Sequence, residues 1–309
     1  MAMVFTEASI PDLSGQVVVV TGANSGIGFE AARAMTARGA TVVMACRNVA
    51  KGERALERIR ALTGSTSAQV EELDLSRLAS VRAFAERIGQ AHGRVDRLVN
   101  NAGVMAIPYE RTEDGFEMQM GTNHFGHFAL TGLLLDALIA APAPRVVTVS
   151  SLAHWFGSIR FGDLHWERRY AKWPAYAQSK LANLLFAFEL QRRFTATRTK
   201  ARSIACHPGF ASTNLQFVGP RLEGSRLTMK LMELNNRFIA QSAADGALPT
   251  LYAAYNPDLR GGEFIGPAGP LGVRGRPGPA RTSRKARDPA LAERLWDVSE
   301  ALTGVTYRF

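Results

Sequence analysis

The fold is decided by the stretch Thr21-Gly22-Ala23-Asn24-Ser25-Gly26-Ile27-Gly28, which follows a short apolar run and precedes a helical pattern. It therefore joins the end of a strand to the start of a helix. Its glycines permit a tight turn, and a helix N-terminus presents free N–H groups to a phosphate, with Asn24 and Ser25 as further polar contacts. The GxxxGxG spacing differs from GxGxxG but still predicts a dinucleotide site, the alternative being a glycine-rich turn without a ligand.

Short apolar runs alternate with longer helical patterns on both sides of this stretch, as is typical of parallel strands joined by crossover helices. Strands are expected at 17–21, 41–45, 70–73, 98–100, 145–150, 203–206 and 263–265, and helices at 26–38, 50–62, 78–91, 121–141, 174–195, 241–255 and 289–302. No repeat or linker interrupts the pattern. The sequence predicts one α/β domain, 1–309, with a Rossmann fold: a doubly wound parallel sheet of about seven strands and helices on both faces.

The composition, 46% hydrophobic and 21% charged, is that of an ordinary globular protein. Cys46 and Cys206 form no CxxC pair, so a reducing, cytoplasmic setting is expected. No signal pattern and no membrane-spanning apolar run is present. The net charge of +10 suggests polyanions as alternative partners, but much of the excess lies in 192–202 and 274–287, which are typical of solvated segments. We therefore expect no nucleic-acid partner and no membrane span.

A second chemical signal is the pair Tyr176 and Lys180, four residues apart in a predicted helix. This spacing places the phenol and the ammonium on one helix face. A free tyrosine has a pKa of about 10, so a neighbouring cation favours proton exchange at neutral pH. Because a surface helix pair gives the same pattern, the interpretation depends on other polar groups. They occur upstream, at Asn100-Asn101-Ala102-Gly103, Asn123 and Ser150-Ser151, at strand ends or on a facing helix.

These motifs and their order resemble the short-chain dehydrogenase/reductase family, with TGxxxGxG, Asp74, NNAG, the Asn, Ser, Tyr and Lys tetrad, and His207-Pro208-Gly209. The resemblance implies a nicotinamide-dependent oxidoreductase that interconverts a carbonyl and an alcohol by hydride transfer and requires no metal. It implies that Ser151 hydrogen-bonds the substrate oxygen and that Tyr176 exchanges the proton. Lys180 would hold the ribose and lower the tyrosine pKa, and Asn123 would help to order a proton-relay water.

The choice between neighbouring candidates follows the same resemblance. The family's catalytic serine is usually the second of such a pair, and alternation along the strand turns its neighbour away, so Ser151 is preferred to Ser150. Tyr170 is the alternative tyrosine, but Pro174 stands four residues after it and offers no ammonium.

The resemblance also implies contacts with the cofactor beyond the glycine turn. It places Asp74 and Leu75 at the adenine, Asn101, Ala102 and Gly103 beside the adenosine ribose, and Pro208, Gly209 and Thr213 around the nicotinamide and diphosphate. Two alternatives stay open. Asp74 can cap the helix that starts near Ser76, and Pro208-Gly209 can be a plain turn.

The second predicted strand ends in Ala45-Cys46-Arg47-Asn48, beside the expected ribose and without an acid. NAD-specific family members place a carboxylate there, which would repel a 2′-phosphate. Arg47 carries the opposite charge and can pair with that phosphate, next to Asn48. We expect NADP(H) to be preferred over NAD(H), the alternative being that Arg47 projects into solvent.

The step of 25 residues from Ser151 to Tyr176 is longer than usual in the family and resembles the branch of retinol dehydrogenases and light-dependent protochlorophyllide reductase. Aromatic residues in and beyond this insert either line an apolar pocket or only pack the insert: Trp155, Phe156, Phe161, Trp166, Trp173, Phe210 and Phe217. The expected substrate is a lipophilic aldehyde, ketone or alcohol, under a flap at 210–240 that includes a partly helical stretch, 215–238. A C-terminal extension, 266–309, carries no readable motif.

Another class of function stays open, namely a catalytically silent family member that senses cofactor binding. Such a protein is expected to have lost a tetrad residue, whereas Asn123, Ser151, Tyr176 and Lys180 are all present. The family precedent favours a homodimer or homotetramer.

Overall fold

A computed structural model describes residues 5–210 and 242–309 of the chain. The strands are β1 (Val17–Thr21), β2 (Thr41–Cys46), β3 (Ala68–Glu72), β4 (Arg97–Asn100), β5 (Arg145–Val149), β6 (Arg202–Cys206), β7 (Phe264–Pro267) and β8 (Pro277–Pro279). The α-helices are α1 (Gly26–Thr36), α2 (Val49–Thr63), α3 (Leu78–His92), α4 (Met118–Met120), α5 (Gly126–Leu133), α6 (Leu135–Ile139), α7 (Lys172–Ala196), α10 (Ala243–Tyr255) and α11 (Pro289–Thr303). Short 3-10 turns are η1 (Glu7–Ser9), η3 (Leu152–Phe156), η4 (Pro270–Gly272) and η5 (Lys285–Arg287), and η2 (Gly121–Phe125) is a π-helical turn.

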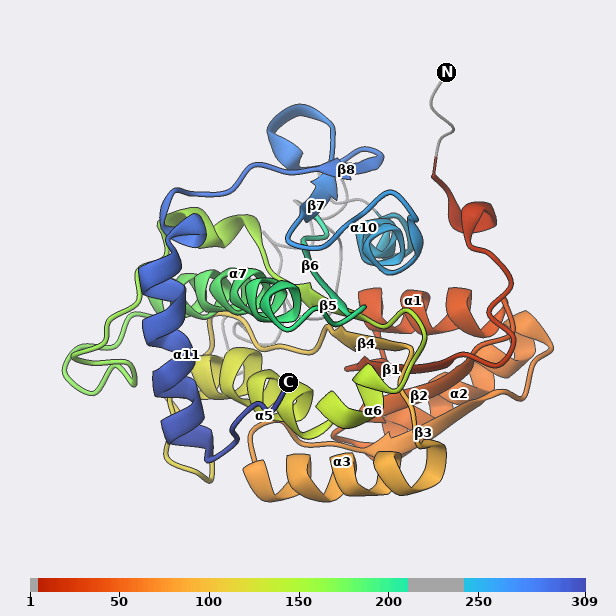
Figure 1. The fold of residues 1–309 in the computed structure, drawn as a ribbon, viewed down its shortest axis with the longest axis horizontal. Coiled ribbons are helices and arrows are strands. Elements are labelled where there is room, and N and C mark those ends of the chain that lie inside the picture. Colours follow the sequence, from red (N-terminus) through yellow and green to blue (C-terminus); the bar gives the residue numbers. More distant parts are fainter. Residues whose placement is uncertain (1–4, 211–241) are drawn as a thin grey trace, which may run out of the picture.

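The strands form one sheet in the order β3-β2-β1-β4-β5-β6-β7-β8, and all neighbours are parallel except β7 and β8 (Figure 1). The chain builds outward from β1 to β3 and then places β4 on the other side of β1. Doubly wound folds bind ligands in the crevice that this reversal opens beyond the carboxyl ends of the strands. The predicted α/β fold with a doubly wound sheet is confirmed.

The sheet has eight strands, one more than expected. The unexpected strand, β8, has the sequence Pro-Gly-Pro, which carries no β-strand signal because proline lacks a backbone N–H and glycine lacks a side chain to pack. Such a strand can pair only at the edge of a sheet, and β8 lies there, antiparallel to β7.

The strands alternate their side chains between two apolar layers, because successive residues point to opposite faces. Val18 and Val20 pack with α1, α2 and α10, whereas Val19 and Val43 pack with α3, α5, α6 and α7 on the other face (Figure 1). Both faces of the central strands are therefore buried, which is why adjacent apolar residues fill their middle positions, as in 17–20 of β1 and Val146-Val147 of β5.

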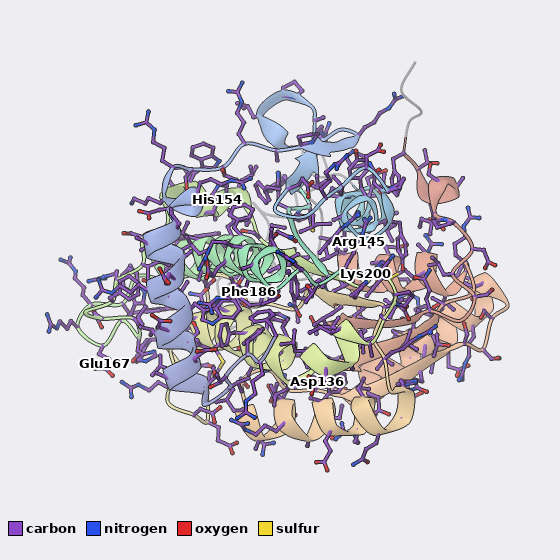
Figure 2. All side chains as sticks on the ribbon, viewed as in Figure 1. Asp136, Arg145, His154, Glu167, Phe186 and Lys200 are labelled. Carbon is purple, nitrogen blue, oxygen red and sulfur yellow. The ribbon has the colours of Figure 1, made fainter. Side chains whose placement is uncertain are left out.

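The C-terminal segment is part of this core. Trp296 on α11 stacks on Phe186 of α7 with ring centroids 5.9 Å apart and meets Phe128 of α5 edge-on at 5.0 Å (Figure 2 labels Phe186). The Tyr307 hydroxyl donates a 2.7 Å hydrogen bond to the Phe128 carbonyl. The residues expected as an extension without a readable motif thus cover the helices on one face of the sheet.

Most predicted boundaries lie within a few residues of those observed, but the single helix expected at 121–141 is wrong. The segment begins with α4 and continues through the π-turn η2, α5 and α6. A Cβ on Gly126 would lie 2.4 Å from the Leu75 carbonyl oxygen, so the helix crosses the loop after β3 at backbone contact distance. This close approach cannot be seen in the pattern of apolar residues. The predicted flap lies, beyond Phe210, outside the described residues, and so do Thr213 and Phe217.

Candidate active site

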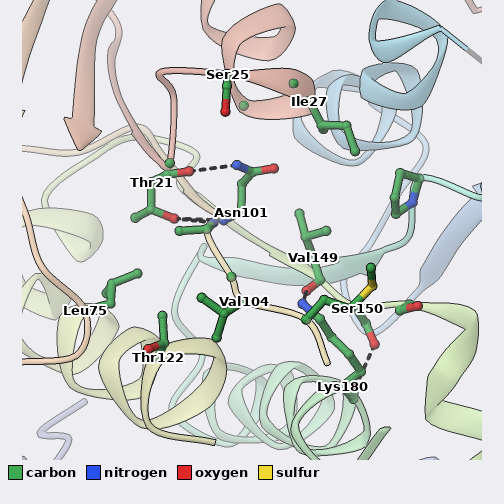
Figure 3. A pocket seen from close by; sticks show the side chains of 18 of the residues that line it. Thr21, Ser25, Ile27, Leu75, Asn101, Val104, Thr122, Val149, Ser150 and Lys180 are labelled. Atoms are coloured by element: carbon green, nitrogen blue, oxygen red, sulfur yellow. Dashed lines mark hydrogen bonds between the residues drawn. The ribbon is translucent and has the colours of Figure 1, made fainter. Parts of the chain in front are cut away.

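A cavity of about 700 Å³ opens beyond the carboxyl ends of β1, β4, β5 and β6. Figure 3 shows Ser25 and Ile27 on one side of it and Ser150 and Lys180 on the other. Its lining includes most of the residues predicted from the sequence: Gly22, Asn24, Ser25, Gly26, Ile27, Gly28, Arg47, Asp74, Leu75, Asn101, Ala102, Gly103, Ser151, Tyr176, Lys180, Pro208 and Gly209. Asn48 and Asn123 do not line the cavity.

The glycine turn has the conformation that its sequence predicts. Gly22 and Gly26 have φ values of +67° and +56°, a region that favours glycine. A Cβ on Gly28 would lie 2.5 Å from the Gly22 carbonyl oxygen, so the helix and the turn touch through backbone atoms. Ser25, the N-cap of α1, makes no side-chain capping bond. The unpaired N–H groups and the positive end of the α1 dipole therefore meet the cavity, and this arrangement fits a diphosphate.

At the end of β2, Arg47 is exposed and lines the cavity, whereas Asn48 does not. The Asn48 side chain instead accepts a 2.8 Å hydrogen bond from the Lys51 N–H as the N-cap of α2. The Asn48 side chain thus serves as a helix cap, for which asparagine is well suited, and its cofactor contact stays a prediction.

Asp74 lines the cavity and also stabilises the turn before α3, so the two interpretations of this residue are compatible. Its Oδ1 accepts hydrogen bonds from the Ser76 N–H at 2.9 Å and from the Ser76 hydroxyl at 2.6 Å. Among the described residues that line the cavity, it is the only carboxylate.

The loop after β4 is fastened to the end of β1. The Thr21 hydroxyl oxygen accepts the N–H groups of Asn101 and Ala102, each at 2.9 Å, and the Asn101 amide donates to the Thr21 carbonyl at 2.8 Å (Figure 3). Sequence reasoning did not assign this role to Thr21. Its position as the last residue of a strand, directly before the glycine turn, was the available signal.

Asn123 lies in the π-turn η2 and is buried. Its amide donates to the Val104 carbonyl and to the Ser179 hydroxyl, both at 2.9 Å, and its Oδ1 accepts the Val104 N–H at 2.8 Å. Three of its four hydrogen-bonding sites thus hold neighbouring protein groups. A Cβ on Gly103 would lie 2.9 Å from this Oδ1, which explains the glycine of the NNAG motif.

Tyr176 and Lys180 lie on one face of α7, buried at the inner end of the cavity. The Lys180 Nζ is 5.7 Å from the centre of the Tyr176 ring and donates a 3.3 Å hydrogen bond to the Val149 carbonyl. Burial raises the pKa of Tyr176 to about 12, against a lowering by the Ser151 hydroxyl, and it lowers the pKa of Lys180 to about 8. The direction for Tyr176 is opposite to the expected one, because loss of water penalises the phenolate more than its neighbours stabilise it.

The two serines after β5 differ in their partners. The buried Ser150 hydroxyl donates a 2.7 Å hydrogen bond to the Lys180 carbonyl (Figure 3). The Ser151 hydroxyl accepts the Ala153 N–H at 3.2 Å and directs its own proton toward Tyr176, which lowers the pKa of that phenol. Tyr170, the alternative tyrosine, donates to the Ile107 carbonyl at 2.8 Å and does not line the cavity.

Only some of the aromatic residues proposed for an apolar pocket line the cavity. Trp173 and Phe210 do, together with Val104 and Met105, which the sequence did not single out. Trp155 and Phe156 do not line it, and they are exposed, as Trp173 is. The remaining described aromatics of the insert pack against arginines: Arg160 lies over the Trp166 ring and Arg294 over the Phe161 ring.

A family model described as short chain dehydrogenase matches residues 16–218 of the chain. The chain therefore belongs to the short-chain dehydrogenase family. It is 43% identical to retinol dehydrogenase 12 from Mus musculus over 304 residues, which is 98% of this chain and 90% of that protein. The predicted resemblance to the family and to its retinol dehydrogenase branch is confirmed.

Solved structures agree with this assignment. A protein from Mycobacterium paratuberculosis superimposes with a TM-score of 0.82 at 45% identity, over 99% of this chain and 100% of that one. A short-chain dehydrogenase from Shigella flexneri in complex with NADP has a TM-score of 0.63 and 25% identity, over 83% of this chain and 98% of that one. Within residues 5–210 and 242–309, no helix combines the length and the apolar character needed to cross a bilayer.

Proposed function

We propose that this short-chain dehydrogenase is an NADP(H)-preferring oxidoreductase that interconverts a lipophilic carbonyl compound and its alcohol. The observation that carries the proposal is a single cavity with a phosphate-type glycine turn at one end and Ser151, Tyr176 and Lys180 at the other. A nicotinamide cofactor, when bound there, supplies or accepts the hydride.

The side chains at the inner end suit the proton part of this reaction. With its pKa raised to about 12 by burial, Tyr176 stays protonated at neutral pH and can donate its proton to an oxygen that gains negative charge. The Ser151 hydroxyl faces the same phenol and can donate a second hydrogen bond to that oxygen. The buried Lys180 ammonium adds a positive charge 5.7 Å from the centre of the Tyr176 ring.

The preference for NADP(H) rests on charge at the end of β2. Arg47 lines the cavity next to Ala45, and no carboxylate of the described lining stands on that strand, since Asp74 follows β3. A guanidinium there can pair with a 2′-phosphate through charge-assisted hydrogen bonds. The similar Shigella flexneri structure binds NADP.

The substrate class rests on the apolar side chains near the reacting end, Val104, Met105, Trp173 and Phe210. Such side chains favour substrates with a large apolar part. The relatives named retinol dehydrogenase agree with this class. A cytoplasmic location and a homodimeric or homotetrameric assembly stay predictions, which cell fractionation and light scattering can test.

The test is a screen of purified protein with NADPH or NADH against lipophilic aldehydes and ketones, followed by loss of the absorbance of the reduced cofactor. We expect carbonyl-dependent oxidation and a higher kcat/KM with NADPH. Equal use of both cofactors would contradict the NADP(H) preference. Tight cofactor binding without turnover of any carbonyl or alcohol would favour the cofactor-sensing alternative.

A further inference from the structure

We propose that His127 is a positioning residue that joins the cofactor-side loop 101–104 to Asn123, and that it does so as the neutral tautomer protonated on Nδ1. The proposal rests on the proposed function, since the loop and Asn123 belong to the site assigned above. His127 does not line the cavity and so acts through its neighbours.

The tautomer follows from what each ring nitrogen faces. His127 lies on α5 with a relative exposure of 1%. Its Nδ1 is 3.0 Å from the Asn123 carbonyl oxygen, and its Nε2 is 2.9 Å from the Thr21 hydroxyl oxygen. A carbonyl can only accept, so Nδ1 must carry the proton. Nε2 must then accept the proton of the Thr21 hydroxyl.

This bond directs the Thr21 hydroxyl. With its proton on the Nε2 side, the oxygen keeps its lone pairs for the N–H groups of Asn101 and Ala102, each 2.9 Å away. The other acceptor near that proton is the Val99 carbonyl, at the longer distance of 3.3 Å. His127 thus favours the hydroxyl orientation that fastens the first part of the loop.

The other ring nitrogen acts on the far end of the loop. Asn123, whose carbonyl accepts from His127, holds Val104 through both its N–H and its C=O. The loop is therefore anchored at Asn101 and Ala102 by Thr21 and at Val104 by Asn123. One imidazole ring connects the two anchors in a buried environment, where hydrogen bonds reinforce one another.

The ring is suited to hold these bonds and not to exchange protons with a substrate. Burial lowers the pKa of His127 to about 4, and the positive charge of Lys180 acts in the same direction. The imidazole is therefore neutral over the pH range in which Tyr176 is proposed to donate its proton and Lys180 carries its charge. A protonated ring would place a second N–H against the Thr21 hydroxyl and reverse the direction of that bond.

The chain provides a matched control in His124, three residues earlier on the same segment and also 1% exposed. Its Nε2 lies 2.9 Å from the Ser299 hydroxyl on α11, so it faces the C-terminal helix and not the loop. Loss of either imidazole removes a comparable buried group, but only loss of His127 disconnects Thr21 from Asn123.

The experiment compares His127→Ala and His127→Phe with His124→Ala and His124→Phe in the full chain. The phenylalanine variants fill the space of the ring but cannot form its hydrogen bonds. They therefore separate the loss of hydrogen bonds from the loss of packing in the alanine variants. Amide hydrogen exchange of the cofactor-free protein gives the first readout. Exchange at Ala102 should rise at least tenfold in the His127 variants and stay within twofold in the His124 variants. Exchange at Asn101 should rise less, because its N–H also donates to the Val99 carbonyl at 3.0 Å.

NADPH affinity, measured by fluorescence titration, gives the second readout. It should fall about tenfold in the His127 variants, equivalent to about 1.4 kcal/mol. In Thr21→Val, a further His127→Phe change should add little, because the bond between them is already lost. Loop exchange and NADPH affinity that match those of the His124 variants would overturn the proposal. The exchange readout needs neither cofactor nor substrate, so its outcome is independent of whether the proposed reaction occurs.

Discussion

The two ends of the cavity differ in how they are built: the cofactor end holds the glycine turn, and the reacting end holds Ser151, Tyr176 and Lys180. At the proposed cofactor end, the glycine turn is packed through backbone atoms where side chains are absent, as at Gly22 and Gly28. At the reacting end, they come from buried side chains on α7 and after β5, among them Tyr176 and Lys180. Substitutions that add side-chain atoms should therefore reduce NADPH affinity at the cofactor end. Substitutions that remove side-chain atoms should reduce kcat at the reacting end.

The largest effect is expected from removing one oxygen at the reacting end. Tyr176→Phe should lower kcat by about 10²- to 10⁴-fold and leave NADPH affinity within twofold, because it removes the transferable proton and little binding surface. Steady-state kinetics and fluorescence titration measure both quantities. Tyr170→Phe is the matched control, since its hydroxyl bonds the Ile107 carbonyl outside the cavity. Near-normal turnover of Tyr176→Phe would remove this tyrosine from the proposed mechanism.

The serine pair tests the same end with two neighbouring hydroxyls. Ser151→Ala should remove about 3 kcal/mol of transition-state stabilisation. This loss lowers kcat on the order of 10²-fold. Ser150→Ala should instead lower the free energy of unfolding by about 1 kcal/mol, because its hydroxyl bonds the Lys180 carbonyl. Kinetics and denaturant titration of both variants separate these outcomes. The reverse ranking in kcat would transfer the role to Ser150.

At the cofactor end, the informative change adds a single methyl group. In Gly28→Ala the new Cβ would lie 2.5 Å from the Gly22 carbonyl oxygen, so the turn must shift. NADPH affinity should fall at least tenfold, and the protein should lose about 1–3 kcal/mol of stability. Gly89→Ala is the control, because open space surrounds Gly89 on α3 and alanine there should stabilise the helix by about 0.5–1 kcal/mol. Unchanged NADPH affinity in Gly28→Ala would show that the turn does not need this contact.

Arg47 is the exception at the cofactor end, because a side chain is proposed to provide the selectivity there. Arg47→Ala should raise the KM for NADPH about tenfold and hardly change that for NADH. Lys51→Ala, which removes another exposed cation outside the cavity, should change neither. An equal rise of the KM for NADPH and the KM for NADH in Arg47→Ala would mean that the arginine does not bind the 2′-phosphate.

The smallest effect concerns pH. Burial lowers the pKa of Lys180 to about 8, so its ammonium is present below that pH and is lost as pH rises through it. NADPH affinity of the free protein should therefore fall severalfold between about pH 8 and 9. In Lys180→Met this dependence should disappear. A flat profile up to pH 10 in the unmodified protein would argue against contact between this ammonium and the cofactor.

Sequence reasoning located the elements whose role depends on local chemistry. The end of β1, the start of α1 at Gly26 and the Tyr176 helix follow from turn glycines and residue spacing, which act within a few residues. The lining beyond the glycine turn was predicted instead from the family resemblance, which placed Asp74, Asn101 and Pro208 beside the cofactor.

What it missed depends on contacts between distant segments. The helical segment that contains the π-turn at Asn123 crosses Leu75 at backbone contact distance at Gly126. The helix cap at Asn48 is local instead, because its bond reaches only to the Lys51 N–H. The neutral His127 has no local signature, because its partners Thr21 and Asn123 come from two other parts of the chain. Contacts among three segments that are separate in the sequence can be identified only from the folded structure.

The connection between His154 and the C-terminal segment also bears on how the protein is made. The His154 Nδ1 donates to the carbonyl of Ser151 at 2.7 Å, and its Nε2 accepts the Ser283 N–H at 3.3 Å (Figure 2 labels His154). The turn that carries Ser151 therefore gets part of its support from Ser283, which lies far along the chain from it. During synthesis, the glycine turn and β1–β5 leave the ribosome long before Ser283 does. A nascent chain can thus assemble the glycine turn first, and the Ser151 turn gains this support only after Ser283 has been synthesised.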